Sequence, residues 1–219
     1  MTPAEFVQRF RAVRASAILR TPHEEAAAPA MEAALRAGFE IIEFTMTTPG
    51  ALDRIGEFSR RESVIVGAGT VLTPEDAEAA VQAGARFLVS PVVDEAVIEK
   101  AISLGVAMMP GTHTPTEMFR AHRAGAVLQK LFPAPGIGPA FVRAVLGPMP
   151  FLNIVPTSGV DLENAAAWIH AGAHAVGFVS PLFDSADIAA GRFERIEDRG
   201  RRMLEAVRVG EARDTARPG

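Results

Sequence analysis

Eight short runs of mostly apolar residues alternate along this chain with alanine-rich segments of helical periodicity. The runs cover residues 16–20, 39–45, 63–69, 86–90, 106–109, 126–130, 151–156 and 174–180. Such alternation predicts parallel strands joined by crossover helices, and the apolar character of the runs predicts a sheet that these helices cover. Eight units in a chain of 219 residues favour a small (β/α)8 barrel, an α/β fold.

The helical segments carry consistent end signals. A glycine follows an alanine just past four of them, at Gly38, Gly84, Gly125 and Gly172. Glycine at this place is typical of a left-handed C-cap. Thr73, followed by a proline and two acidic residues, predicts a helix N-cap.

The main alternative fold is a doubly wound open sheet. That fold more often has five to seven strands and a glycine-rich first turn, whereas this chain has "SAILRTPHEE" at that place. A hydrophobic content of 48% is enough for a sizeable core, and no linker interrupts the pattern. We therefore expect residues 1–219 to form a single barrel domain.

Composition and charge exclude several classes of partner. The net charge of −4 is small, and the arginines are scattered except for Arg199, Arg201 and Arg202, which we expect on a solvated helix face. Neither feature indicates nucleic-acid binding. The first 16 residues have a charged helical pattern and no apolar stretch typical of a signal peptide or a membrane span. With no cysteine in the chain, we expect a soluble cytoplasmic protein without membrane partners.

Lys130 is the most unusual residue of the predicted strands. The chain contains 20 arginines but only two lysines, and Lys130 ends an otherwise apolar run. Glu43 lies near the end of the second run, and the polar ends of barrel strands form the catalytic face. An amine and a carboxylate on an apolar floor indicate Schiff-base chemistry. The alternatives are a lysine that snorkels to solvent and a structural Glu43 that keeps Lys130 charged.

The proposed chemistry has a definite energetic requirement. A free lysine has a pKa of about 10.4, so that only about one molecule in a thousand carries the neutral amine near pH 7. Lowering this pKa by about three units costs the ammonium form about 4 kcal/mol, which burial can supply. Glu43 is then placed to move protons during dehydration and carbon–carbon bond cleavage.

The five histidines do not form a metal-binding pattern. His113 follows a strand and is a candidate for substrate contact, whereas we expect the other four to be structural. No two of them have a convincing ligand spacing with a carboxylate. A metal-dependent reaction is therefore disfavoured, and we expect no cofactor.

Four segments of the chain carry a family resemblance. They read "GFEIIEFTMTTPGA", "VIVGAGTVLTPEDAEAAVQAGARFLVSP", "PGTHTPTE" and "QKLFPAPGIGPAFVRAVLGPMPF". In order and spacing they resemble the class I aldolases that act on 2-keto-3-deoxy-6-phosphogluconate and 4-hydroxy-2-oxoglutarate, over about residues 12–208. The resemblance implies a (β/α)8 barrel, a metal-free retro-aldol reaction that releases pyruvate, and a homotrimer.

The resemblance also implies roles for individual residues. Lys130 falls on the Schiff-base lysine of the family and Glu43 on its general acid/base. Thr70 falls on a residue that contacts the pyruvate carboxylate, and Pro91 on a wall of that pocket. These roles agree with the chemistry expected from Lys130 and Glu43 alone.

Two departures from the family pattern affect the expected substrate. Thr47 stands where many members have an arginine, so we expect Thr47 to line the pocket without providing a two-pronged anchor. Arg20, at the end of the first strand, is the candidate replacement, unless it forms a strand-end ion pair. "AILR" and "IGP" resemble the branch that cleaves 2-keto-3-deoxy-6-phosphogalactonate.

The second departure lies in the loops after the last two strands. Thr157, Ser158, Gly159 and Ser180 offer hydroxyls and amides for a phosphate, near a helix that we expect Asp161 to cap. Ser158 and Val179, however, replace family glycines that let a phosphate approach the backbone. A sugar acid without phosphate, or a short 4-hydroxy-2-oxo acid, therefore stays an alternative substrate.

Two other functions remain open from the residues. A cofactor-free barrel isomerase or epimerase would use Glu43 as its base and Lys130 as an electrostatic stabiliser. A non-catalytic barrel that binds sugar acids would use neither group chemically. Covalent capture of pyruvate separates the aldolase from both.

Overall fold

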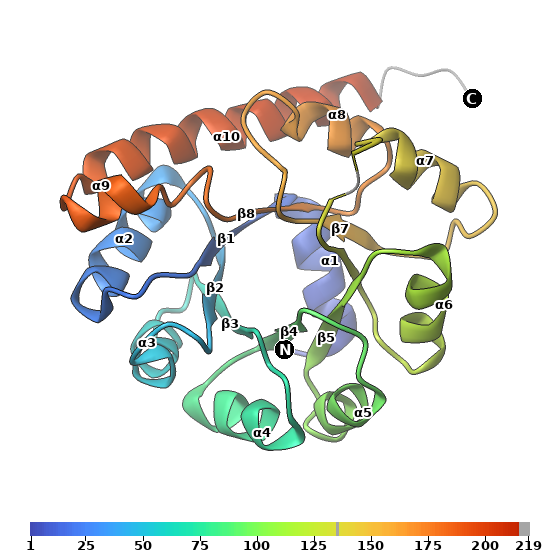
Figure 1. Ribbon diagram of the computed structural model, residues 1–219, viewed down its shortest axis with the longest axis horizontal. Helices are drawn as coiled ribbons and strands as arrows, with labels where there is room; N and C mark the ends of the chain where they lie inside the picture. The colour runs from blue at the N-terminus through green and yellow to red at the C-terminus, as the bar shows by residue number, and fades with distance from the viewer. Residues whose placement is uncertain (135, 215–219) are drawn as a thin grey trace.

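All eight expected strands are present in the computed structural model, which describes residues 1–134 and 136–214. They are β1 (Ala15–Leu19), β2 (Ile41–Thr45), β3 (Ile65–Gly69), β4 (Phe87–Ser90), β5 (Ala107–Thr112), β6 (Gln129–Leu131), β7 (Ile154–Pro156) and β8 (Val176–Phe178). Each strand is parallel to its neighbours in the order β7-β6-β5-β4-β3-β2-β1-β8, and the strands curve into a barrel (Figure 1). Between β7 and β8, the His174 N–H donates to the Ile154 carbonyl at 2.8 Å.

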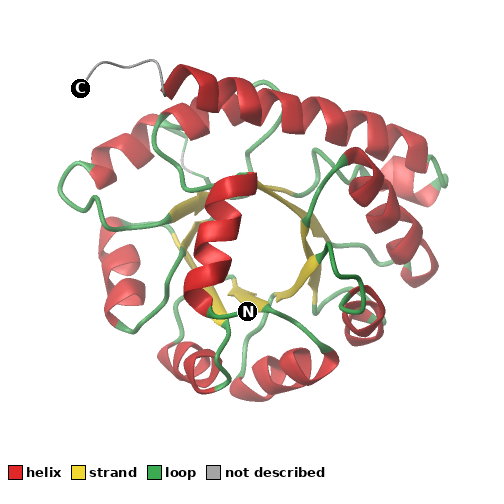
Figure 2. Cartoon of the chain, turned by 180° about the vertical axis from the view of Figure 1, so that it is seen from behind, coloured by secondary structure: helices red, strands yellow, loops and turns green. Residues whose placement is uncertain are grey.

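Helices surround this barrel, as the alternation predicts. They are α1 (Pro3–Val13), α2 (Glu24–Ala37), α3 (Ala51–Phe58), α4 (Pro74–Ala83), α5 (Glu95–Ser103), α6 (Pro115–Arg123), α7 (Ala140–Leu146), α8 (Ala165–His170), α9 (Ser185–Ala189) and α10 (Phe193–Asp214). Helix α1 crosses one open end of the barrel (Figure 2). Within the described part of the chain, no helix is both long and apolar enough to cross a membrane.

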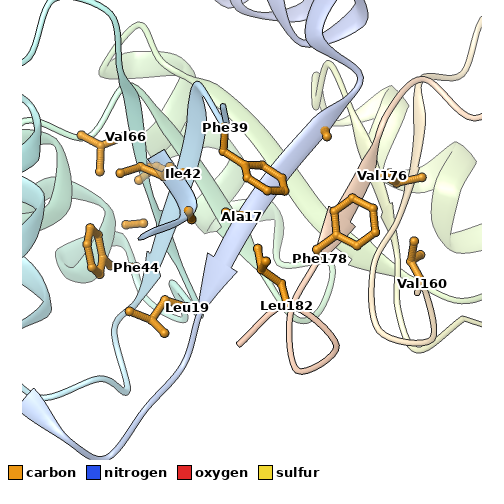
Figure 3. Close-up of a cluster of buried hydrophobic side chains, with 14 of the residues drawn as sticks. Ala17, Leu19, Phe39, Ile42, Phe44, Val66, Val160, Val176, Phe178 and Leu182 are labelled. Atoms are coloured by element: carbon orange, nitrogen blue, oxygen red, sulfur yellow. The ribbon is translucent and has the colours of Figure 1, made fainter. Parts of the chain in front are cut away.

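Two apolar clusters divide the core because successive strand residues point to opposite faces. The outer cluster packs strands such as β1, β2 and β8 against the surrounding helices (Figure 3). The inner cluster joins Phe6 and Phe10 of α1 to residues inside the barrel, including Ile41, Leu128 and Val155. Apolar side chains thus fill the end of the barrel that α1 closes, and the polar strand residues lie toward the opposite end.

The helix end signals at Thr73 and at the four glycines are confirmed. Thr73 and Asp76 form a capping box at the start of α4, with reciprocal bonds between their side chains and backbone amides. The four glycines that follow helices all have a positive φ, between 99° and 115°. These local signals act within a few residues, which explains why the sequence is sufficient to find them.

Strands β6 and β7 begin three residues later than expected. The Gln129 side chain donates to the Ala126 carbonyl at 3.1 Å and accepts from the Asn153 amide at 3.0 Å. The Asn153 side chain donates to the Val127 carbonyl at 2.9 Å. Side chains therefore take the place of the strand ladder here, and Lys130 lies in the middle of β6 instead of ending it. Strand β5, in contrast, extends further than expected, to Thr112.

The expectation that Arg199 lies on a solvated helix face is wrong. Its guanidinium donates to the Leu182 carbonyl at 3.0 Å and pairs with Asp187 at 2.7 Å. Asp187 is buried on α9 and also pairs with Arg192 and Arg195. These ion pairs hold α9 and the loop after β8 against α10, a role that only the tertiary contacts reveal.

Candidate active site

Lys130 and Glu43 both lie on the inner face of the barrel. Glu43 is two residues after Ile41, and Lys130 is two residues after Leu128, and both of these apolar residues belong to the inner cluster. Because side chains alternate along a strand, the amine and the carboxyl group share that face. Lys130 is 7% exposed and Glu43 is 1% exposed. Two residues that are 87 positions apart in sequence thus face the same interior of the barrel.

Burial changes the protonation of these two groups in opposite directions. The pKa of Glu43 is raised, mainly because burial disfavours its charged form, although the charges of Lys130 and Arg20 oppose that rise. The pKa of Lys130 is lowered, mainly by burial and further by Arg20, against the attraction of Glu43. Neither carboxylate oxygen of Glu43 has a hydrogen-bond partner among the described residues. This arrangement favours a neutral amine next to a protonated carboxyl group.

Two glycines of neighbouring strands allow close approaches at this site, one to the Glu43 side chain and one to the Pro91 backbone. A Cβ at Gly69 would collide with Oε1 of Glu43, so the carboxyl group lies directly against the β3 backbone. A Cβ at Gly111, which pairs with Lys130, would collide with the Pro91 carbonyl. Pro91 therefore packs onto the strand next to the lysine, where the resemblance implies a pocket wall. The sequence analysis did not single out these glycines, although glycine inside a strand often marks a close approach.

The end of β5 holds the lysine strand. Thr112 is buried, and its hydroxyl donates to the Lys130 carbonyl at 2.9 Å. The Phe132 amide donates to the Thr112 carbonyl at 3.0 Å. The Phe132 ring then lies with its centroid 5.0 Å from Nζ of Lys130. Thr112 is a third residue that the sequence analysis missed, because nothing local indicates its partner.

Arg20 is exposed at the end of β1, and a set of three threonines, two of them buried, lies at the end of β2. Arg20 follows β1 directly, is exposed, and acts electrostatically on both Glu43 and Lys130. The Thr45 hydroxyl lies 3.1 Å from the hydroxyls of both Thr47 and Thr48. Thr47 is the exposed member of this set. The rim on this side therefore combines one guanidinium with several hydroxyl groups.

Thr70 directly follows β3 and has an unusual backbone conformation. Its φ is +58°, a left-handed conformation that few β-branched residues adopt. Such strain is retained where the surrounding structure specifies it, and it often occurs at functional sites. Thr70 is also only partly buried, which leaves it accessible to a ligand.

In the loop after β7, Ser158 replaces a family glycine but has the left-handed backbone conformation that glycine favours. Ser158 has a φ of +37°, and Gly159 has a φ of +89°. The Ser158 carbonyl accepts from the Ala134 amide at 3.3 Å, which links this loop to the segment after Lys130. The Thr157 hydroxyl is buried without a hydrogen-bond partner among the described residues. Ser180, in the loop after β8, is exposed.

The expected helix cap at Asp161 is wrong. Helix α8 begins only at Ala165, and Asp161 and Asn164 instead bond to each other through side chains and amides at 2.9 and 3.0 Å. Residues 161–164 form a turn, because this exchange satisfies the groups that a longer helix would use. The helix does not reach the loop of Ser158 and Gly159, so any amides offered there belong to the loop.

No three histidine or carboxylate side chains come together as a potential metal site in the described residues. His113, the candidate for substrate contact, bonds through Nδ1 to the Pro133 carbonyl at 2.9 Å. His174 is buried and bonds through Nε2 to the Val7 carbonyl at 3.0 Å.

Comparison with known proteins places this geometry in context. The model of the KDPG and KHG aldolase family matches residues 7–199. The 2-dehydro-3-deoxy-6-phosphogalactonate aldolase of Escherichia coli is 33% identical over 175 residues, 76% of this chain and 83% of the relative. The 2-dehydro-3-deoxy-phosphogluconate aldolase of Treponema pallidum is 33% identical over 212 residues, 95% of this chain and 99% of the relative.

Solved structures agree with this similarity. The native KDPGal structure superposes with a TM-score of 0.83 at 30% identity, covering 90% of this chain and 96% of its own. KDPG aldolase from Legionella pneumophila, captured with pyruvate as a covalent carbinolamine, superposes with a TM-score of 0.81 at 25% identity, covering 89% and 96%. A designed cage built by fusing symmetric oligomeric domains gives a TM-score of 0.85 at 29% identity, covering 92% of this chain and 74% of that chain.

Proposed function

Since the chain belongs to the KDPG and KHG aldolase family, we propose that it is a class I aldolase that releases pyruvate and an aldehyde from its substrate. The substrate class is a 2-keto-3-deoxy sugar acid of the 6-phosphogluconate or 6-phosphogalactonate type, or 4-hydroxy-2-oxoglutarate. The observation that carries the proposal is the buried pair of Lys130 and Glu43. Burial lowers the pKa of Lys130 and raises that of Glu43, which favours the neutral form of each group.

The first half of the reaction forms the Schiff base. The neutral Lys130 amine attacks the C2 carbonyl carbon of the substrate, while Glu43 donates a proton to the carbonyl oxygen. The resulting hydroxyl group takes a second proton, which Glu43 transfers from the nitrogen, and leaves as water. A C2=N iminium and a Glu43 carboxylate remain. A raised pKa suits this step, because burial favours the protonated form of Glu43 that donates here.

The second half breaks the carbon–carbon bond. Glu43, now a carboxylate, accepts the proton of the 4-hydroxyl group, and the electron pair of the C3–C4 bond moves into the iminium. The aldehyde leaves and an enamine remains on Lys130. Glu43 gives that proton to C3 of the enamine, and water hydrolyses the resulting iminium to pyruvate and the free amine. The proton that hydrolysis releases returns to Glu43.

The rim residues are proposed to bind the two ends of the substrate. Arg20 and Thr70 hold the carboxylate of the keto acid, with Thr47 beside them and Pro91 as a wall. The electrostatic link of Arg20 to both catalytic groups supports this assignment. The loops of Thr157, Ser158, Gly159 and Ser180 are proposed to hold the distal end of the substrate, whether phosphorylated or not. Relatives of both phosphorylated substrate classes match at 33% identity, so the branch itself is part of the proposal.

We also propose that three copies of the chain associate and act in the cytoplasm. The likeness to a cage assembled from symmetric oligomeric domains supports a symmetric oligomer, and a chain without cysteine suits a reducing compartment. Sedimentation equilibrium should give three times the mass of one chain. A mass of one chain would contradict the trimer.

Covalent capture tests the proposed function. Pyruvate with borohydride should add one reduced adduct, and peptide mapping should place it on Lys130. Lys130→Met should abolish both capture and turnover, with the fold checked by circular dichroism. Lys100 is the only other lysine, and it pairs with Glu78 on the surface at 3.3 Å, so Lys100→Met is the matched control and should keep both activities. Capture on Lys100 alone, or no capture, would contradict an aldolase and favour an isomerase or a binding barrel.

A further inference from the structure

Three hydrogen bonds join the end of β5 to the segment that contains Lys130. Two of them come from Thr112, which bonds to the Lys130 carbonyl at 2.9 Å and to the Phe132 amide at 3.0 Å. The third comes from His113, whose Nδ1 bonds to the Pro133 carbonyl at 2.9 Å. A carbonyl oxygen only accepts, so Nδ1 must carry the proton and donate. Thr112 thus holds the amide of Phe132, and His113 holds the carbonyl of the next residue, Pro133.

The held residue, Phe132, is the one whose ring faces the reactive amine. Its ring centroid lies 5.0 Å from Nζ of Lys130. An aromatic ring at this distance keeps water away from the amine, which favours the neutral form. This effect depends on where the ring lies, and therefore on the backbone around Phe132.

His113 is itself held in place by the start of α6. Its backbone amide donates to Oε2 of Glu117 at 2.8 Å, and the Thr114 amide donates to the same oxygen at 2.8 Å. His113, Phe132 and Pro133 line one cleft of about 330 Å³, which Pro91 and Thr112 also line. The exposed imidazole thus reaches Pro133 from a loop that Glu117 holds.

We propose that His113 is a positioning residue, which holds the backbone after Lys130 so that the Phe132 ring stays against the Schiff-base amine. This inference rests on the proposed function of Lys130. His113 does not touch the substrate in this role, contrary to its sequence-based assignment as a contact residue. Without the Nδ1 bond, the bonds of Thr112 remain but Pro133 is released from β5, so that the Phe132 ring shifts and water reaches the amine.

The test compares three variants by pyruvate capture and by steady-state kinetics. His113→Leu removes the donor, whereas His113→Asn keeps a donor at the place of Nδ1. His122→Leu is the matched control, because His122 is an exposed histidine at the other end of α6, where it packs on Phe151. The rate of borohydride capture is measured against pH, since it reports the free-amine fraction of Lys130. The charged groups that influence this amine, Glu43 and Arg20, are the same in all three variants.

We expect His113→Leu to move the midpoint of the capture profile upward by about one pH unit, which is a tenfold loss of free amine below the midpoint. Its kcat should fall about tenfold with KM nearly unchanged. His113→Asn should restore both values to within about threefold, and His122→Leu should match the unchanged protein.

Two results would overturn the inference. An unmoved capture profile in His113→Leu would show that the bond does not position Phe132. A rise in KM alone, without recovery in His113→Asn, would make His113 a substrate contact. The proposed function fails separately, because it predicts capture on Lys130 of the unchanged protein.

Discussion

Glu43 is buried, and neither of its carboxyl oxygens has a hydrogen-bond partner among the described residues. Burying a polar group without a partner reduces the stability of the fold. A carboxyl group that only supported the fold would be expected to bond to a neighbour. Lys130 makes no ion pair with it among the described residues. The alternative in which Glu43 keeps Lys130 charged would require such a pair. The geometry therefore favours two reactive groups that the fold holds at an energetic cost.

Glu43→Gln should separate catalysis from stability. We expect turnover to fall by about 10²- to 10⁴-fold, the usual loss for a general acid/base. Burial raises the pKa of Glu43, so its contribution to stability is largest below pH 4.5 and is lost as the pH rises toward the folded value. The uncharged glutamine avoids that loss. Thermal unfolding at pH 7 should thus give an equal or higher Tm, and capture of pyruvate should still occur. Unchanged turnover with a lower Tm would make Glu43 a structural partner.

Arg20→Ala tests the substitute anchor. Arg20 is exposed and forms no ion pair among the described residues, so its removal should leave the fold stable. We expect KM to rise by the equivalent of about 1.5 to 3 kcal/mol, the range of a hydrogen bond to a charged group. Arg36→Ala is a suitable control, since Arg36 pairs with Glu197 on the outer surface at 2.8 Å. If KM and kcat are unchanged while stability falls, Arg20 belongs to the scaffold.

At the scale of elements, the loops after β7 and β8 are less free to adjust than their sequence implies. The β7 loop is linked to the lysine segment by the bond from Ala134 to Ser158. The β8 loop is held at the Leu182 carbonyl by Arg199 of α10. Side chains at Ser158 and Val179 therefore cannot be moved aside at little cost. A phosphate should stay further from the backbone than it would with glycine at both places.

We predict weak discrimination for phosphate as a result. The kcat/KM for a phosphorylated 2-keto-3-deoxy sugar acid should exceed that of its plain counterpart by less than about a hundredfold, a difference of about 2.7 kcal/mol. The double variant Ser158→Gly, Val179→Gly should increase this ratio. Inorganic phosphate at millimolar concentration should inhibit the variant more than the unchanged protein. A preference of a thousandfold in the unchanged protein would show that the two side chains do not hinder phosphate.

At the scale of the whole molecule, α1 closes the end of the barrel opposite to the site. Its Phe6 ring stacks on Phe87 with a centroid distance of 4.6 Å, and His174 bonds to its Val7 carbonyl. Burial lowers the pKa of His174 to about 4. The neutral imidazole is therefore part of the closed barrel near neutral pH.

His174 makes stability depend on pH in a defined direction. In the unfolded chain it takes up a proton below about pH 6.5, whereas the folded protein excludes that proton until about pH 4. Stability contributed by the neutral form is thus lost as the pH falls from 6.5 to 4, by about 3 kcal/mol in total. Urea unfolding at pH 7.5 and 4.5 measures this loss in the free energy of unfolding. The loss should be smaller for His174→Gln than for the unchanged protein, because glutamine keeps a donor for Val7 but does not titrate. Equal losses in both proteins would contradict a neutral His174.

The sequence by itself determined the number and order of the strands and the helix ends at Thr73 and at the four glycines, and it singled out Lys130 and Glu43 as candidates. These depend on periodicity, capping residues and composition, which act over a few residues and can be read along the chain. Lys130 was identifiable because an amine in an apolar run is unusual wherever the run is placed. The family resemblance added roles for Thr70 and Pro91 that no local pattern indicates.

Tertiary structure alone decided what lies next to each of these residues. That Gly69 makes room for Glu43, that Arg199 faces inward, and that His113 and Thr112 hold the lysine segment all depend on strands distant in sequence. Side chains of Gln129 and Asn153 shortened two strands. Burial and hydrogen bonding arise only when the barrel closes, because they depend on contacts between residues that the chain brings together in folding. Those contacts set the pKa values of Lys130 and Glu43, and so the chemistry of the site.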